Sequence, residues 1–435
     1  MTGGQPAAEL REAFFRVRRQ TTELAVPLAI EDYVAQSMPD ARPAKWHLGH
    51  TSWYFETFVL TASGVLVAPD VPGAEQTRFS PSRPEYQAIF GVSDAGIPHP
   101  RVVSRDRGAL TRPTVAEVFD YRRRVDDAMS ELLAGELPGE VRELVELGLH
   151  HEQQHQERLL ADLKHLFSRN PLYPAYREAS GGPRRGAVPP PLRFVSFAGG
   201  TLPIGCPGTG FAYDNERPRH ERRIAPFQFG SRLITNGEYL EFMEEGGYGE
   251  RSLWLSDGWE ARLAGGWEAP LHWVREGDGF AEFTLGGLVS LAPEAPVTHV
   301  SHFEADAFAR WREARLPTEF EWESAAADEP VAGTFLENGD LRPEPTPAAA
   351  YRGASGPVQL FGDAWEWTAS AYLPYPGFRP SGRFGQSSGK SMSGRMVLRG
   401  GSCFTPASHI RASYRHVLRP DARWQATGIR IARDG

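Results

Sequence analysis

The fold is decided by the run His150-His151-Glu152-Gln153-Gln154-His155-Gln156-Glu157, which lies in an amphipathic helical segment expected from Pro138 to about Ser168. His151 and His155 are four residues apart, so on a helix their imidazoles project from one face on adjacent turns. Such a pair can bind one metal ion, and imidazole is a ligand for zinc, iron, copper or nickel. For an isolated pair, a solvated polar helix is the more common explanation. A metal site therefore requires another ligand from elsewhere in the chain.

A second candidate helix begins after Pro43 and contains the run Trp46-His47-Leu48-Gly49-His50-Thr51-Ser52-Trp53-Tyr54. His50 shares one helix face with three aromatic residues, Trp46, Trp53 and Tyr54, whereas His47 lies toward the edge of that face. Taken alone, His50 is better explained as a buried histidine that is hydrogen-bonded to a neighbour. With His151 and His155 it completes a set of three imidazoles, and facing helices of bundles commonly build metal sites in this way. Zinc and iron both suit this set.

The ligand set predicts some of the chemistry of such a site. Three neutral imidazoles leave ferrous iron its full charge and leave about three octahedral positions open. The familiar oxygenase triad lowers that charge, because it replaces one imidazole with a carboxylate. A more positive metal should bind an anionic thiolate or selenolate well, since metals lower the pKa of coordinated thiols. The spacing of the histidines alone does not distinguish this site from a structural zinc site.

Length and composition limit the class of protein. A chain of 435 residues is expected to form two or three domains, and its net charge of −8 argues against nucleic acid or an anionic membrane as the main partner. The two cysteines do not form a disulfide scaffold, and no signal peptide or long apolar run is recognisable. We therefore expect a soluble, cytoplasmic protein.

The pattern of elements predicts an α+β multidomain protein. Residues 7–172 have helical periodicity, with a helix near 9–24 and another after Pro113 that starts with a capping box formed by Thr114 and Glu117. The long stretch 65–112 is expected to be an irregular crossover in a four-helix bundle. Residues 173–191 are expected to be a linker rich in proline and glycine. Residues 192–434 should form an irregular α+β domain, with helices near 236–246, 304–314 and 319–327.

Two tyrosines of the second domain, Tyr372 and Tyr375, are candidate catalytic acids. A tyrosine is a suitable proton donor to reduced oxygen if it reaches the metal. The competing explanation is packing, because aromatic residues in segments rich in proline and glycine usually serve the core. Cys403 is expected to be a small buried residue rather than a nucleophile.

Several stretches resemble known families. Residues 192–434 resemble the formylglycine-generating-enzyme-like (sulfatase-modifying factor) fold in Arg315-Leu-Pro-Thr-Glu-Phe-Glu-Trp322, Gly362-Asp-Ala-Trp-Glu-Trp-Thr368 and Arg399-Gly-Gly-Ser402. Residues 7–172 resemble the DinB-like bundle in Lys45-Trp-His-Leu-Gly-His50 and in His151-Glu-Gln-Gln-His155. The order of the motifs in two fused domains is similar to that of the ergothioneine-biosynthesis sulfoxide synthases (EgtB).

The resemblance implies a mononuclear non-haem Fe(II) enzyme that uses O2 to join sulfur to the imidazole C2 of hercynine. Carried over by position, the iron ligands would be His50, His151 and His155. Gln154 would help to hold hercynine, and Tyr372 or Tyr375 would be the active-site tyrosine. The trimethylammonium group of hercynine needs an aromatic cage, to which we expect Trp46 and Tyr54 to contribute.

The sequence departs from the family on the side that is expected to bind the chalcogen donor. A Tyr-Tyr pair of many relatives is missing from the crossover, where Phe90 and Ser93-Asp94 stand. In place of an acidic or aromatic residue near the C-terminal arginines, the chain has His416, which we expect to contact the donor. These changes favour a selenoneine synthase (SenA) that takes a selenosugar, 1-seleno-β-D-glucose. The alternative is a sulfoxide synthase of the EgtB type that takes cysteine or γ-glutamylcysteine.

Two hypotheses of other classes remain. DinB-like bundles with three histidines also serve as zinc-dependent thiol transferases. The fold of the second domain also serves as a non-catalytic ligand-binding scaffold.

Overall fold

The computed structural model describes residues 7–62, 66–67, 77–92, 104–178, 188–208, 210–345, 356–386, 389 and 391–435. The chain divides into two compact units. The first comprises residues 1–166 together with the short segments 209–211 and 383–385, and the second comprises the remainder. Ser93, Asp94 and the central part of the expected linker, residues 179–187, lie outside the described residues.

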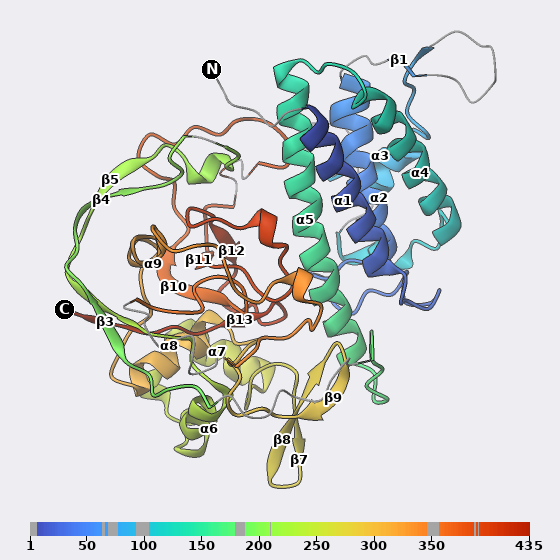
Figure 1. Ribbon diagram of the computed structural model, residues 1–435. Coiled ribbons are helices and arrows are strands. Elements are labelled where there is room, and N and C mark those ends of the chain that lie inside the picture. Colours follow the sequence, from blue (N-terminus) through green and yellow to red (C-terminus); the bar gives the residue numbers. More distant parts are fainter. Residues whose placement is uncertain are drawn as a thin grey trace. The chain divides into compact units, whose positions relative to one another are not determined.

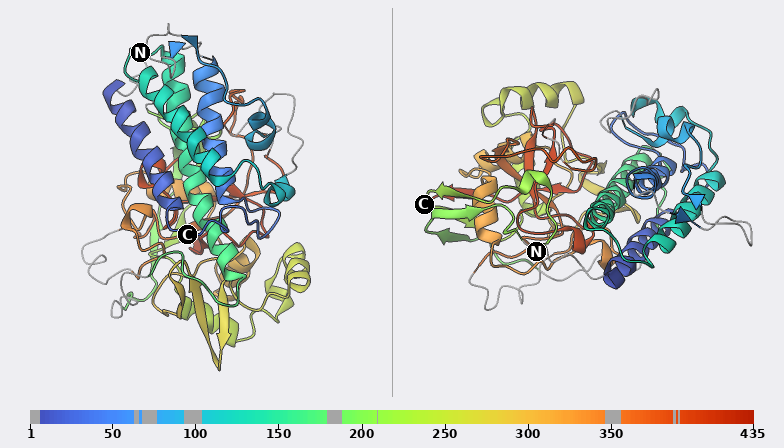
Figure 2. Two further views of the ribbon diagram at one scale, coloured as in Figure 1. Left: turned by 90° about the vertical axis from the view of Figure 1, so that its right-hand side faces the viewer. Right: turned by 90° about the horizontal axis from the view of Figure 1, so that it is seen from above.

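The first unit is a helical bundle (Figures 1 and 2). Its helices are α1 (Ala7–Ala25), α2 (Ala44–Tyr54), α3 (Glu85–Phe90), α4 (Val115–Leu132) and α5 (Gly139–Ser168). A π-helix, Phe55–Thr61, continues α2, a 3-10 turn spans Ser104–Ala109, and a short hairpin pairs β1 (Leu66–Val67) with β2 (Thr77–Arg78). The expected capping box is present, since the side chain of Thr114 accepts from the backbone N–H of Glu117 and that of Glu117 accepts in return. The crossover is less irregular than expected, because α3 lies within it.

Close packing of α2 against α5 requires a small residue on α5. A Cβ atom at Gly148 would lie 2.5 Å from Cε1 of Tyr54 and 2.7 Å from Cε1 of Phe55. A side chain at this position would therefore force the rings of Tyr54 and Phe55 to move. Since Gly148 precedes His151 by one helical turn, this contact also sets how closely the histidines of α5 approach those of α2.

The second unit combines short helices with several small sheets. Its helices are α6 (Asn236–Glu244), α7 (Ser256–Gly265), α8 (His302–Trp311) and α9 (Glu319–Ala326). Three of these match the expected helical stretches, and α7 was not expected. The largest sheet has the strand order β12-β11-β10-β13, formed by His416–Leu418, Met396–Arg399, Trp365–Ala371 and Thr427–Gly428.

The other sheets of this unit are antiparallel. A three-stranded sheet has the order β14-β6-β3 and a pair joins β4 to β5, with bounds Ala432–Asp434, Phe227–Gly230, Phe194–Phe197, Gly200–Ile204 and His220–Ile224. A meander contains β7 (Trp273–Glu276), β8 (Gly279–Thr284) and β9 (Gly287–Ser290).

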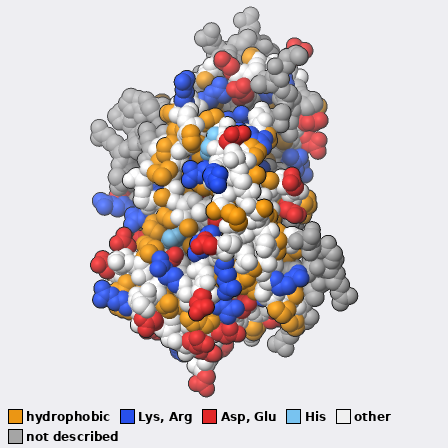
Figure 3. Space-filling view, turned by 90° about the vertical axis from the view of Figure 1, so that its left-hand side faces the viewer, with side chains coloured by type: hydrophobic (Ala, Val, Ile, Leu, Met, Phe, Trp, Pro, Cys, Tyr) orange, Lys and Arg blue, Asp and Glu red, His pale blue; other side chains and the backbone are white. Residues whose placement is uncertain are grey.

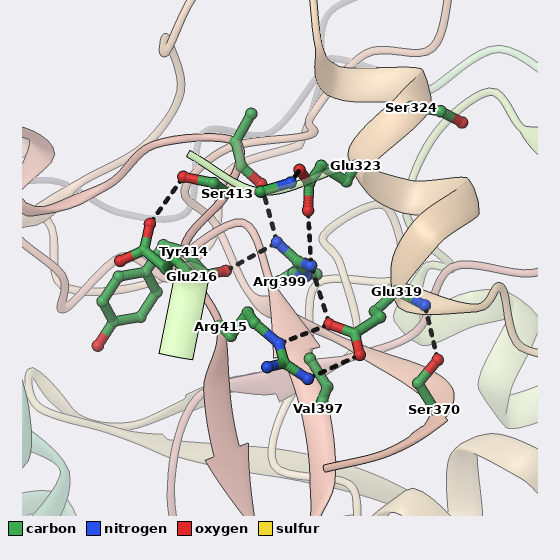
Figure 4. Close-up of polar contacts among 12 residues, drawn as sticks. Glu216, Glu319, Glu323, Ser324, Ser370, Val397, Arg399, Ser413, Tyr414 and Arg415 are labelled. Atoms are coloured by element: carbon green, nitrogen blue, oxygen red, sulfur yellow. Dashed lines mark hydrogen bonds and ion pairs between the residues drawn. The ribbon is translucent and has the colours of Figure 1, made fainter. Parts of the chain in front are cut away.

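Buried ion pairs join the elements of the second unit. Glu366 of β10 accepts from Arg430 at 2.7 Å, and both side chains are fully buried. Glu319 of α9 bridges Arg399 of β11 and Arg415, at 2.9 and 2.8 Å (Figure 4). Buried charges are tolerated when they are paired and hydrogen-bonded, so these contacts tie the few regular elements together.

The surface carries charges of both signs. On the face in Figure 3, basic and acidic side chains are intermingled with apolar ones, in line with 47 basic and 55 acidic residues in the chain. Among the described residues, no helix is long and apolar enough to span a membrane.

Candidate metal centre

The helices α2 and α5 bring together the three histidines that the sequence singles out. One nitrogen from each of His50, His151 and His155 lies within 4.8 Å of the others, and all three side chains are buried. The ring centroids are 5.0 Å apart for His50 and His151 and 4.7 Å apart for His151 and His155. Three side chains from two helices thus converge on one point, which is the arrangement that a mononuclear metal site requires.

The electrostatic surroundings keep these imidazoles neutral. Burial lowers the pKa of His151 to about 4. Burial and the neighbouring histidine His151 lower the pKa of both His50 and His155 well below the usual value of 6.5. A neutral imidazole is the form that binds metals, so at neutral pH the three rings are in their ligand state.

The hydrogen bonds of the three rings show which nitrogens are available. Nδ1 of His50 lies 2.6 Å from the carbonyl oxygen of Phe90, so Nδ1 donates and Nε2 keeps its lone pair. Nδ1 of His151 is buried and has no hydrogen-bond partner among the described residues. An unpartnered buried polar atom is costly, and a ligand bond to a metal would relieve that cost. The residues of this site therefore fit a metal ion.

Aromatic rings surround the three histidines. Trp46 stacks on His50 with centroids 4.3 Å apart, and Tyr54 lies 5.1 Å from His151. Phe384, from the short segment 383–385 that belongs to the helical unit, lies 6.1 Å from His50 and 5.6 Å from His151. Phe384 is remote in sequence from both helices, so no local pattern predicts that it lies beside the histidines. The apolar rings limit the access of water to the centre.

The site also contains a buried arginine, Arg107, that was not identified from the sequence. The guanidinium carbon of Arg107 lies 3.8 Å from the ring of Trp46, the side chain is 6% exposed, and its Nε has no hydrogen-bond partner among the described residues. Burial and the neighbouring Arg42 and Arg158 lower the pKa of Arg107 to about 9. Among the described residues, no carboxylate is paired with the buried guanidinium of Arg107. A group of three neighbouring guanidiniums, one of them buried in this way, is suited to binding an anion.

The remaining predicted residues have other surroundings. Gln154 is half-buried on α5, next to His155. In the second unit, Nε2 of His416 lies 2.8 Å from Oε1 of Gln425, and the His416 ring stacks on Trp365. Cys403 is buried, as expected.

The two candidate tyrosines differ in their hydrogen bonds. The hydroxyl of Tyr372 accepts from Nδ2 of Asn215 at 2.9 Å. The hydroxyl of Tyr375 accepts from Nη2 of Arg399 at 3.1 Å and donates to Glu319 at 3.4 Å. Burial raises the pKa of Tyr375. Tyr375 is thus part of the buried ion-pair network of the second unit.

Comparisons with known proteins agree with this architecture. Residues 13–159 match the DinB superfamily, and residues 183–435 match the sulfatase-modifying factor enzyme 1-like domain. The hercynine oxygenase of Mycolicibacterium thermoresistibile is 32% identical, over 98% of this chain and 95% of that protein. The hercynine oxygenase of Mycolicibacterium smegmatis is 33% identical, over 92% of each chain.

The chain belongs to the hercynine oxygenase family. The resemblance inferred from the motifs and the α+β multidomain fold class are therefore confirmed. A formylglycine-generating enzyme of Streptomyces coelicolor is 27% identical over 55% of this chain. Both its identity and its coverage are lower than those of the two hercynine oxygenases. The three histidines of this family member lie in the part that matches the DinB superfamily.

Proposed function

We propose that the chain catalyses the formation of a carbon–chalcogen bond at the imidazole C2 of hercynine, and that it depends on Fe(II) and O2. The observation that carries this proposal is the convergence of three neutral, buried imidazoles on one point, lined by aromatic rings. Membership of the hercynine oxygenase family supports the choice of substrate. Iron, when bound, would supply the redox reaction with O2 and lower the pKa of a coordinated thiol or selenol.

The aromatic residues have different roles in this proposal. The ring of Trp46 already has a cation from the chain itself, because Arg107 lies over it. Tyr54 and Phe384, whose ring centroids are 6.1 Å apart, are better suited to receive the trimethylammonium group of hercynine. The role of Trp46 would then be to hold His50 and Arg107 in place, which differs from the cage role expected from the sequence.

Of the two tyrosines, Tyr372 is the better candidate for the proton donor. Asn215 donates to its hydroxyl, and this hydrogen bond would stabilise the phenolate that remains after the proton has left. Tyr375 instead donates to Glu319 and accepts from Arg399. Removing the proton of Tyr375 would place a further negative charge beside a buried carboxylate.

Two donors are candidates. A selenosugar is favoured by the departures of the sequence from the sulfur enzymes, above all the missing Tyr-Tyr pair and His416. A thiol that carries a carboxylate, such as cysteine or γ-glutamylcysteine, is favoured by the buried guanidinium of Arg107 and its neighbours. If the selenosugar is the donor, these arginines would bind the carboxylate of hercynine instead.

The test offers hercynine, Fe(II) and O2 to the full chain, with the selenosugar, cysteine or γ-glutamylcysteine in parallel. Mass spectrometry identifies the product, and His151→Ala is the control without a complete ligand set. A selenium product with inert thiols supports the first donor, and turnover of a thiol alone removes it. If no donor gives a product modified at C2, the proposed function is wrong.

A zinc-dependent thiol transferase predicts a different metal and no oxygen consumption. Metal analysis of protein purified without oxygen, together with an oxygen electrode, separates this reaction class from the one proposed.

A further inference from the structure

His47 lies directly behind one of the metal-binding histidines. It is on α2, one turn before His50, and its side chain is fully buried. Its Nδ1 lies 2.8 Å from Nδ1 of His155, and its Nε2 lies 3.1 Å from Oδ2 of Asp162. The helical periodicity predicts His47 at the edge of its helix face, and no role for it was inferred from the sequence.

The position of Asp162 is fixed by the same two helices. It follows His155 by seven residues, so both side chains lie on one face of α5. Its Oδ2 also accepts from the backbone N–H of Arg42 at 2.8 Å, just before α2 begins. The carboxylate is therefore held in place before any metal binds.

The hydrogen-bond chain has one direction when His47 is neutral. An ionised carboxylate can only accept, so Nε2 of His47 carries the proton and donates to Asp162. Nδ1 of His47 then has a lone pair and accepts from Nδ1–H of His155. In that tautomer, Nε2 of His155 has a free lone pair for a metal.

We propose that His47 and Asp162 are positioning residues that fix the tautomer and ring orientation of His155 and strengthen it as a ligand. This inference rests on the metal centre of the proposed function. The ligands differ in this respect, because His50 donates to a backbone carbonyl and Nδ1 of His151 has no partner in the described part of the chain. Carboxylates behind a ligating histidine raise its basicity.

The experiment measures the binding of cobalt(II) by the full chain without oxygen, by visible absorption and equilibrium dialysis. His47→Phe keeps a flat ring but cannot accept a hydrogen bond. We expect it to weaken binding about 10- to 100-fold and to shift the absorption bands. His47→Gln offers an amide oxygen to His155 and should recover most of the affinity. The affinity of Asp162→Asn for cobalt(II) should lie between those of the wild type and His47→Phe.

A matched control is His165→Gln. His165 is on the same helix, and its Nδ1 is hydrogen-bonded with the hydroxyl of Ser37 at 2.7 Å. This variant should bind cobalt(II) like the wild type. Thermal unfolding without metal shows whether each variant is folded. If His47→Phe is not folded, the affinity of Asp162→Asn for cobalt(II) decides the matter.

The outcomes separate this inference from the metal centre itself. Suppose that the wild type binds cobalt(II) through the three histidines, and that folded His47→Phe or Asp162→Asn has the same affinity and spectrum. The positioning role of His47 and Asp162 is then wrong, but the metal centre is still supported. If the wild type does not bind cobalt(II), or if His151→Ala binds it equally well, both the metal centre and the positioning role of His47 and Asp162 are wrong.

Discussion

Oε1 of Glu152 lies 2.6 Å from Nη2 of Arg122 in the core of the helical unit, one residue after His151, a proposed metal ligand. The other oxygen of Glu152 accepts from Nη1 of Arg18 at 3.0 Å. Burial alone would raise the pKa of Glu152, but the two guanidiniums lower it to about 2. This pairing links α1, α4 and α5 through one carboxylate.

Glu152→Gln should destabilise the protein strongly. The substitution leaves the buried guanidinium of Arg122 without its ion-pair partner, whereas Arg18 keeps its ion pair with Asp126. Breaking a buried ion pair costs about 3–5 kcal/mol. Denaturant unfolding followed by circular dichroism measures the loss. The matched control is Asp120→Asn on α4, which removes an exposed ion pair with Arg123 and should cost less than about 1 kcal/mol. Equal effects of the two variants would contradict a structural role for the buried network.

Arg107→Gln should weaken the binding of a carboxylate-bearing substrate about 10- to 100-fold, because a charge-assisted hydrogen bond contributes about 1.5–3 kcal/mol. The ratio kcat/KM, measured with each substrate in turn, shows whether hercynine or the donor is affected. Arg105→Gln is the control, since Arg105 is exposed. If an analogue without the carboxylate loses as much affinity as its parent, Arg107 does not bind that group.

Tyr372→Phe and Tyr375→Phe should affect different properties. Losing a positioned proton donor typically slows turnover by about 10²–10⁴-fold. We therefore expect Tyr372→Phe to turn over slowly while its unfolding free energy stays that of the wild type. Tyr375→Phe removes a hydrogen-bond partner from buried Arg399 and should lower the unfolding free energy by about 1–3 kcal/mol. Steady-state kinetics and unfolding of both variants check the assignment, which fails if Tyr372→Phe turns over at the wild-type rate.

The stability of the second unit should depend on His302. Burial lowers the pKa of His302 to about 4, against 6.5 for the exposed group. The unfolded state therefore binds more protons between these two pH values, so the unfolding free energy is highest above pH 6.5. It falls as the pH drops through this window, by up to about 3 kcal/mol for this group. His302→Leu should flatten this part of the stability profile, and an unchanged slope would show that other groups cause it.

The helical unit follows closely from local sequence signals. The spacing of His151 and His155, the capping box at Thr114 and the apolar periodicity are properties of single helices, so they could be recognised without knowing the fold. The convergence of His50 with the other two needed one further assumption, that α2 and α5 face each other. Gly148 supplies the close contact between these helices.

Other residues around the histidines, unlike Trp46 and Tyr54, were not predictable in this way. His47 and Asp162 lie on different helices, and only the angle at which these pack decides that they meet. Arg107 lies in a crossover without periodicity, and Phe384 comes from a segment far along the chain. Such contacts arise from tertiary packing, which leaves no local pattern in one sequence.

The most direct test of the metal centre is an anaerobic titration of the metal-free full chain with Fe(II), comparing the wild type with His151→Ala. The proposed centre predicts one equivalent of tightly bound iron in the wild type and a large loss of affinity in the variant, with both proteins folded. Equal binding by the two proteins, or zinc that stays bound while Fe(II) fails to bind, would contradict it.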